Sequence, residues 1–321
     1  MVIPVYGCAD CLEALHRRLR ASLEPLTADF ELIFVDDRSP DGAWEALSAL
    51  AASDPAVRAV RLSRNFGQHA AITAGLAETR GRWTVVMDCD LQEPPEAIPR
   101  LYAKAREGFD IVHTRRRGRS SRPRRLLSGA YFRLRNFFVG TRTGVDNGTL
   151  SMLSRKVVDT FLRLRDQHRE YLIALDWLGY RSATVEVDAA ERHAGRSSYT
   201  PRRLLRLAVD GMFFQTTILL RWIVGVGFLV TAAGLLLAAY NIYVYFTDDP
   251  LPGYTSLAVL VLLLAGFIIA SLGVIGLYVG KVFEQVKGRP LFVVDERTPE
   301  PDAAGLPGEP EASEGAAAAR R

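Results

Sequence analysis

Cysteine is scarce in this sequence, and its positions exclude two kinds of small framework. Three cysteines occur in 321 residues, which excludes a disulfide-rich scaffold. Cys8 and Cys11 form a Cys-x-x-Cys pair, but no second pair and no nearby histidines complete a zinc site. We therefore expect the cysteines to be inert, packed side chains of a protein in a reducing compartment.

Glycine-rich phosphate loops are also missing. The residues after the first expected strand, 2–6, match neither the dinucleotide-binding pattern nor the P-loop pattern. A bound diphosphate would therefore depend on a metal ion and on cationic side chains. We also expect no signal peptide, because Met1 runs directly into that strand.

Two long apolar runs are present near the end of the chain, at 222–246 and 254–280. Each is uncharged and exceeds the roughly 20 residues that a helix needs to cross a bilayer. The loop between them is acidic, whereas basic residues flank the pair: Arg221, Lys281, Lys287 and Arg289. The positive-inside rule then predicts a two-helix hairpin over 221–281 in the cell (inner) membrane, with both termini and the soluble part in the cytoplasm.

The formal charge is +4, which suggests anionic partners. Nucleic acid is one candidate, but clustered arginines beside a membrane more simply meet anionic lipid headgroups or a phosphorylated substrate, so we expect no nucleic acid. Residues 1–200 are long enough for one domain with its own core. We expect a cytoplasmic juxtamembrane segment at 282–297 and a disordered tail at 298–321, because the composition turns to Pro, Glu, Ala and Gly.

The first domain reads as strands alternating with helices, which predicts an α/β fold with a mainly parallel, Rossmann-like sheet and helices on both faces. The expected strands are 2–6, 30–35, 56–62, 83–87 and 109–113, and the expected helices are 10–23, 41–52, 68–79 and 95–107. Ligands of such sheets bind beyond the carboxyl ends of the strands.

Informative residues follow four of these strands. They are Pro4 and Tyr6, then Asp36 and Asp37, then Arg64, and finally Asp88 and Asp90. In an extended backbone Asp88 and Asp90 project from one face, where Gln92 adds a third oxygen. These hard oxygen ligands suit Mg²⁺ or Mn²⁺. The alternative interpretation is a strand followed by an acidic turn.

The segment after the second strand combines two kinds of acidic residue. Ser39 and Asp41 are explained as caps of the next helix. Asp36 and Asp37 lie before the turn, where a buried carboxylate needs a donor such as a base N–H or a ribose hydroxyl. We therefore assign these two to nucleotide binding.

Two basic segments are candidates for binding phosphate groups or the membrane surface. An arginine run begins at residue 115 and includes Arg117; it is either a solvated loop or a lid over donor and acceptor phosphates. Residues 201–220, which begin with Pro201 and Arg202, mix arginines with leucines and phenylalanines, as in a helix lying in the membrane interface; a core-facing helix is the alternative. Gly276 and Gly280 permit close helix approach within the hairpin or in a homo-oligomer.

Several motifs together resemble family 2 glycosyltransferases of the polyprenyl-phosphate branch. They include Val35-Asp36-Asp37-Arg38-Ser39, Asp88-Cys89-Asp90-Leu91-Gln92 and Arg192-His193-Ala194-Gly195-Arg196-Ser197-Ser198-Tyr199. The resemblance implies a GT-A-like fold and inverting, metal-dependent transfer of one sugar from a nucleotide sugar to a polyprenyl phosphate, in cell-envelope glycan modification. A UDP-hexose is the favoured donor and GDP-mannose the second choice.

Residue roles carry over from the resemblance. Pro4, Tyr6, Asp36 and Asp37 would contact the nucleotide, with Arg64 nearby, and Asp88, Asp90 and Gln92 would hold the metal. Arg192 and Ser197 would grip phosphate oxygens beside Tyr199. Arg117 and Arg202 are assigned to the acceptor phosphate from the charge of the two basic segments and not from the resemblance. The chain departs from the family at Gly7-Cys8, where Asn-Glu is frequent, at Arg38, and at Thr149, where an acid is frequent.

The last departure bears on catalysis. A lipid phosphate is mostly dianionic near neutral pH, because its second pKa is about 6, and needs no general base. Asp146 is then at most an orienting group. The alternatives are a processive polysaccharide synthase, a glycolipid synthase with another lipid acceptor, and a non-catalytic membrane scaffold. Gln215 lies six positions before Arg221-Trp222, which does not match the Gln-x-x-Arg-Trp signature of processive synthases.

Overall fold

The computed structural model describes residues 1–117, 147–167, 169–188, 218–247 and 254–299. The catalytic candidates Asp146 and Arg192 lie outside these residues. So do the expected phosphate and acceptor ligands Ser197, Tyr199 and Arg202, with most of the expected interfacial helix. These assignments remain predictions.

The described part of the domain is built on one mixed sheet of eight strands in the order β7-β5-β6-β4-β1-β2-β3-β8. The strands are β1 (Val2–Val5), β2 (Leu32–Asp36), β3 (Val57–Leu62), β4 (Trp83–Val86), β5 (Ile111–Arg117), β6 (Asn147–Ser154), β7 (Ser182–Asp188) and β8 (Val294–Arg297). β4, β1, β2 and β3 are neighbours and parallel, as the sequence predicts. β6 runs antiparallel to β4 and β5, and β8 antiparallel to β3.

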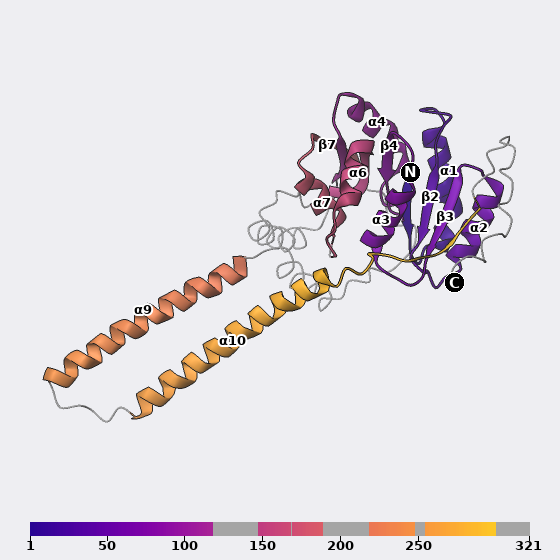
Figure 1. Ribbon diagram of the computed structural model, residues 1–321. Helices are drawn as coiled ribbons and strands as arrows, with labels where there is room; N and C mark the ends of the chain where they lie inside the picture. The colour runs from indigo at the N-terminus through magenta and orange to yellow at the C-terminus, as the bar shows by residue number, and fades with distance from the viewer. Residues whose placement is uncertain (118–146, 168, 189–217, 248–253, 300–321) are drawn as a thin grey trace, which may run out of the picture.

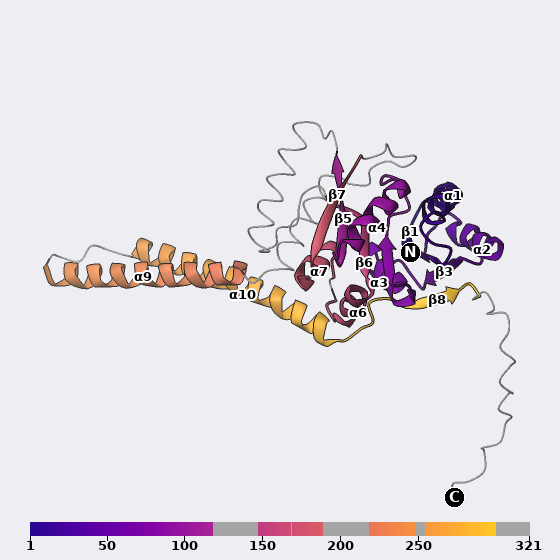
Figure 2. The same ribbon diagram turned by 90° about the horizontal axis from the view of Figure 1, so that it is seen from above.

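Helices cover both faces of this sheet (Figures 1 and 2). They are η1 (Ala9–Cys11), α1 (Leu12–Leu23), α2 (Ala43–Ser53), α3 (Gln68–Glu78), η2 (Pro95–Ala97), α4 (Ile98–Arg106), α6 (Arg155–Arg163) and α7 (Tyr171–Leu178). Alternate residues of β1 separate the two cores: Ile3 packs with α1, α2 and α4, and Val2 with α3, α6 and α7. The period-two pattern of a strand buried on both faces explains this division.

Two long helices, α9 (Ile218–Thr247) and α10 (Tyr254–Val286), extend away from the domain side by side (Figures 1 and 2). They contain the two apolar runs. Among the described residues, Leu264–Val286 is the one helical segment long and apolar enough to cross a membrane, and Ile223–Leu236 is a shorter apolar segment. Large apolar side chains such as Phe228 and Ile269 are exposed along them, which is typical of a surface that contacts lipid or another protein.

Side chains at the end of α10 bind the loop between α6 and α7. Gln285 accepts a hydrogen bond from the Gln167 backbone N–H (3.0 Å) and donates one to the Arg165 carbonyl (2.7 Å). Gln167 in turn donates through its side chain to the carbonyl of Arg289 (2.7 Å). These bonds fix the end of the long helix to the α/β domain.

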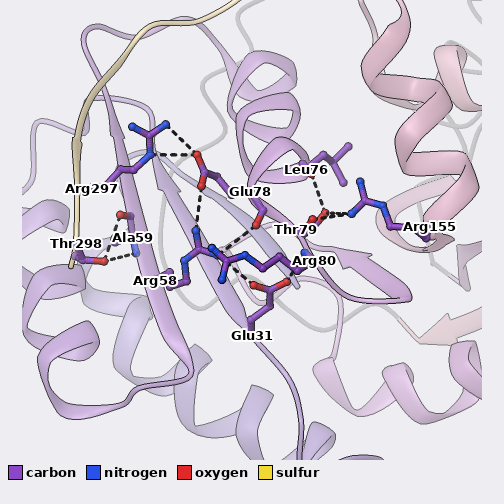
Figure 3. A network of polar contacts seen from close by, with 10 residues as sticks. All are labelled: Glu31, Arg58, Ala59, Leu76, Glu78, Thr79, Arg80, Arg155, Arg297 and Thr298. Carbon is purple, nitrogen blue, oxygen red and sulfur yellow. Dashed lines mark hydrogen bonds and ion pairs between the residues drawn. The ribbon is translucent and has the colours of Figure 1, made fainter. Parts of the chain in front are cut away.

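The chain then returns to the sheet as β8, which the sequence interpretation did not include. Residues 294–297, placed in a juxtamembrane segment, form an edge strand on β3. Thr298, placed in the disordered tail, is ordered: its N–H donates to the Ala59 carbonyl (3.0 Å), and its hydroxyl accepts from the Ala59 N–H (2.9 Å). Glu78 holds both strands at once, because it accepts from Arg58 on β3 and from Arg297 on β8 (Figure 3).

We expect Arg297→Ala to loosen β8 while leaving the rest of the sheet intact. Arg297 is 55% exposed, so its ion pair with Glu78 stabilises the strand by only about 0.2–1 kcal/mol. Amide hydrogen exchange should therefore become faster at residues 294–298 and stay unchanged in β1 and β2. Arg106→Ala, at an exposed site on α4, is the matched control. Equal exchange rates in the two variants would contradict the assigned role of Arg297.

Candidate functional site

The carboxyl ends of the parallel strands meet at one edge of the sheet, and direct contacts connect the segments that follow them. Asp37, after β2, binds the loop after β3. Gln68, at the start of α3, donates to Asp88 after β4 (2.6 Å). Cys8, after β1, is disulfide-bonded to Cys89. The structure therefore places six of the predicted residues at one edge of the sheet, where the strand pattern expects them: Tyr6, Asp36, Asp37, Arg64, Asp88 and Asp90. Their roles in binding a ligand stay predictions.

Pro4 does not lie where the sequence interpretation placed it. It is a buried residue inside β1, paired with Val35 of the neighbouring strand, rather than a residue beyond the strand end. Tyr6 is the first residue past β1 and is 54% exposed. Of these two candidates, Tyr6 is therefore the one with an accessible side chain.

Asp37 obtains its hydrogen-bond donors from the protein. Its carboxylate accepts the N–H groups of Phe66 (2.7 Å) and Gly67 (2.8 Å). Burial raises the pKa of Asp37, although these two backbone hydrogen bonds act to lower it. Gly67 has φ +95°, a conformation that favours glycine. We predicted that Asp37 needs a hydrogen-bond donor from a ligand, and this prediction is wrong. Asp37 instead holds the β3–α3 loop.

Asp36 is fully buried, and only one of its two carboxylate oxygens accepts a hydrogen bond. One oxygen accepts the Ser39 backbone N–H (2.8 Å). The other has no hydrogen-bond partner and lies 3.5 Å from Nε of Arg61, itself without one. A buried carboxylate oxygen in this state is suited to a further donor from a ligand.

The expected helix caps have a different role. α2 begins after Gly42, and its N-cap has no side-chain hydrogen bond. Asp41 instead accepts the Ala9 N–H (2.9 Å), and Ser39 accepts the Gly7 N–H (3.3 Å). These residues hold the loop after β1 against the loop after β2, because the backbone groups beyond a strand end lack ladder partners.

Two arginines place positive charge at this edge. Arg64 is exposed and lies over the Phe66 ring, 4.1 Å from its centroid. Arg38 has φ +60° and forms an ion pair with Asp295 of β8 (2.7 Å). The returning strand therefore reaches the turn that follows Asp36 and Asp37.

The carboxylate pair lies in a turn, which corrects the strand geometry expected from its spacing. β4 ends at Val86, so Asp88 and Asp90 are not consecutive same-face residues of a strand. Asp90 accepts the Gln92 backbone N–H (3.1 Å), and Leu91 between them has φ +56°. We call residues 88–92 the acidic turn.

The acidic turn suits a hard divalent cation only as a shared site. Its donors are two carboxylates and one amide oxygen, which match the preference of Mg²⁺ and Mn²⁺. Among the residues that the structure describes, no group of three or more His, Cys, Asp or Glu side chains is arranged to hold a metal. Ligand oxygens, such as those of a diphosphate, would complete the coordination.

The disulfide corrects our interpretation of the cysteines. Cys8 and Cys89, 81 residues apart, are bonded to each other, and Cys11 is free and buried. Cys89 stands between Asp88 and Asp90, so the bond ties the acidic turn to the loop after β1. Spacing along the chain gives no signal for this pairing.

The arginine run also differs from the expected loop. Residues 115–117 belong to β5, where they pair with Asn147 of β6 or with residues of β7. Arg117 is therefore a strand residue at the end of the described segment. Its assignment to the acceptor phosphate stays a prediction.

Comparisons with known proteins agree on one family. The model of glycosyl transferase family 2 matches residues 1–162. The chain is 31% identical to a bactoprenol glucosyl transferase of Shigella phage SfX, over 92% of this chain and 98% of the relative. It is 36% identical to an undecaprenyl-phosphate 4-deoxy-4-formamido-L-arabinose transferase of Pseudomonas fluorescens strain Pf0-1, over 92% and 88%.

A solved structure is similar at lower identity. It is glucosyl-3-phosphoglycerate synthase from Mycobacterium tuberculosis, in complex with Mn²⁺, UDP-glucose and phosphoglyceric acid. The TM-score is 0.44 at 20% identity, covering 66% of this chain and 76% of that chain.

The disulfide predicts a specific pattern of thiol labelling. Alkylation of the denatured protein without reductant should label one cysteine, Cys11, and labelling after reduction should reach all three. Cys89→Ser should lower the free energy of unfolding by about 2–4 kcal/mol, because it opens a long covalent loop. Cys11→Ser is the control that keeps the bond. Three labelled cysteines without reductant would contradict the pairing.

Proposed function

Because the chain belongs to glycosyl transferase family 2, we propose that it transfers one sugar from a nucleotide sugar to a polyprenyl phosphate. The single observation that carries this proposal is the acidic turn, which lies at the carboxyl edge of the sheet. Asp36 and Arg64 follow other strands at the same edge. The two curated relatives named above support the acceptor, since their names specify bactoprenol and undecaprenyl phosphate.

The proposed setting is the cytoplasmic face of the cell membrane. α9 and α10 would both cross the bilayer as a hairpin, although α9 contains only the shorter apolar segment. The α/β domain and both termini would then be cytoplasmic. A polyprenyl tail could remain in lipid while its phosphate reaches the sheet edge, and anionic headgroups would meet the arginines of the chain.

Donor binding follows from the described side chains. Tyr6 and Asp36 would contact the nucleotide, and Arg64 would add positive charge near its phosphates. Asp88, Asp90 and Gln92 would hold a divalent cation, which supplies Lewis-acid stabilisation of the leaving nucleoside diphosphate. We favour a UDP-hexose as donor, with GDP-mannose as the second choice.

The acceptor phosphate would act as the nucleophile without a general base, because it is largely dianionic near neutral pH. Direct attack at the anomeric carbon breaks its bond to the diphosphate and inverts its configuration. The protein then has to position two phosphorylated reactants and exclude water. Arg192 and Ser197 are the proposed phosphate ligands on the acceptor side.

Charge stabilisation should matter more here than proton transfer. We expect Asp90→Asn and Asp88→Asn to lower kcat by roughly 100-fold or more, because each removes a carboxylate from the proposed metal site. Asp146→Asn should lower kcat by less than the roughly 100-fold that is expected when a general base is lost. Initial rates with Mn²⁺ measure both, with Asp29→Asn, exposed at the opposite edge, as control. Equal losses in Asp146→Asn and Asp90→Asn would overturn this mechanism.

The product distinguishes the proposed function from its alternatives. Purified protein with undecaprenyl phosphate, Mn²⁺ and a panel of labelled nucleotide sugars should give a lipid that carries one sugar. Thin-layer chromatography and mass spectrometry measure the product. A long polymer would instead identify a processive synthase, and no transfer from any donor would identify a scaffold.

A further inference from the structure

Glu93, which directly follows the acidic turn, is a buried carboxylate without an assigned role. Its residue exposure is 2%. Burial of a carboxylate is costly unless hydrogen bonds compensate it, so a residue in this position has a specific set of partners. Those partners identify what Glu93 holds in place.

The partners come from two neighbouring strands. One oxygen of Glu93 accepts the hydroxyl of Thr114 on β5 (2.6 Å), and the other accepts the backbone N–H of Leu150 on β6 (2.8 Å). A single side chain thus joins the residue after the acidic turn to both strands of the antiparallel β5–β6 pair. All three groups are buried.

The strand register explains why a side chain is needed there. β4 pairs with β6 from Trp83↔Ser154 to Val86↔Ser151 and then ends. β6 continues past that point toward Asn147, and its pairing with β5 is irregular between His113 and Arg115. Leu150 is the first residue of β6 beyond the end of the β4 ladder. The Ser154 N–H binds the Asp110 carbonyl on the β5 side, and Leu150, four positions before it, faces the same side. The Glu93 carboxylate therefore supplies the acceptor for the Leu150 N–H at the place where the β5–β6 pairing is irregular.

The Glu93 side chain also packs closely against the backbone of Gly148. A Cβ at this position would lie 1.7 Å from Oε1 of Glu93 and 2.7 Å from Oγ1 of Thr114. Its φ is outside the left-handed region, so backbone conformation does not require glycine here. Lack of space is the reason. Glu93 and Gly148 are therefore a matched pair in which one side chain occupies the volume that the other leaves open.

We propose that Glu93 is a positioning residue that sets the distance between the acidic turn and the start of β6. The turn is held on its other side by Gln68 and by the bond from Cys8. Glu93 completes this support, and so keeps Asp88, Asp90 and Gln92 in the arrangement that binds metal and diphosphate. This inference rests on the proposed function, because it assigns the support of the same site.

Three substitutions should affect the contacts of Glu93 in different ways. Glu93→Gln preserves the contacts: its Oε1 can accept the Leu150 N–H while its amide donates to Thr114, whose proton can turn to the Leu150 carbonyl 2.9 Å away. Glu93→Ala removes both hydrogen bonds. Gly148→Ala forces the carboxylate aside without removing it.

Titration calorimetry with UDP present and no acceptor measures the Mn²⁺ concentration for half-maximal binding. We expect this concentration to rise 10-fold or more in Glu93→Ala. Loss of a group that orients metal ligands typically lowers metal affinity by about 10- to 100-fold. Gly148→Ala should show a similar rise, and Glu93→Gln should stay within about threefold of wild type. In Glu93→Ala the amide of Leu150 should also exchange faster, which reports the lost bond independently of metal.

The double variant Glu93→Ala/Gly148→Ala tests the spatial pairing. The alanine at 93 vacates the space nearest the new Cβ, and the Thr114 hydroxyl, 2.7 Å from that Cβ, is then no longer bonded to Glu93 and can rotate away. The Mn²⁺ constant of the double variant should therefore equal that of Glu93→Ala alone rather than the product of the two effects. Thr114→Val, which removes one donor, provides a milder variant if Glu93→Ala does not fold, and should weaken Mn²⁺ binding by a smaller factor. Thermal melting establishes that each variant is folded.

The outcomes separate this inference from the proposed function. If wild type binds no Mn²⁺ with UDP, or Asp90→Asn binds it equally well, the metal site itself is wrong. If wild type binds Mn²⁺ through Asp90 but folded Glu93→Ala and Thr114→Val bind it as tightly, the positioning role is wrong while the function stands. Multiplicative effects in the double variant would also overturn the Glu93–Gly148 pairing.

Discussion

Polar groups at the carboxyl edge of the sheet must find partners after the parallel strands have ended, and the site depends on how this constraint is met. Within the strands, ladder hydrogen bonds satisfy the backbone. Beyond them, carboxylates take over: Asp37 binds two N–H groups of the β3–α3 loop, and Asp41 binds the loop after β1. Glu93 has the same role inside β6, where the pairing with β5 is irregular and the Leu150 N–H binds its carboxylate. The acidic residues of this edge are thus divided between building the loops and facing a ligand. Asp36, Asp88 and Asp90 are the candidates that remain for the second task.

The two long apolar helices and the candidate site are parts of one connected structure. Gln285 fixes the end of α10 to the loop before α7, and the chain then runs along the sheet to add β8. Asp295 in β8 pairs with Arg38 in the turn after Asp36 and Asp37. A short path of backbone therefore links the apolar helix to the proposed nucleotide site. If the helices cross a bilayer as proposed, the fold itself would set the position of the domain relative to the membrane.

Much of this architecture could be predicted because it follows from local patterns. The five expected strands and four expected helices all occur, since apolar periodicity and loop residues are properties of neighbouring positions. The rule that ligands bind beyond the carboxyl ends of parallel strands predicted which edge of the sheet carries the candidate site residues. Pro4 and residues 115–117 were assigned wrongly because strand boundaries depend on partner strands. The expected elements also lacked β6, β7, α6 and α7. They lacked β8 because a four-residue edge strand has no strong pattern of its own.

The sequence by itself determined the alternating elements, the apolar helices and the motif residues that indicate a family 2 glycosyltransferase. Only the tertiary structure decided which partner each of these residues has. Asp37 meets Phe66 across 29 residues, Glu93 meets Leu150 across 57, and Cys8 meets Cys89 across 81. These pairings depend on which strands become neighbours. Chain folding fixes that choice by burying two cores at once, and no spacing along a single sequence encodes it.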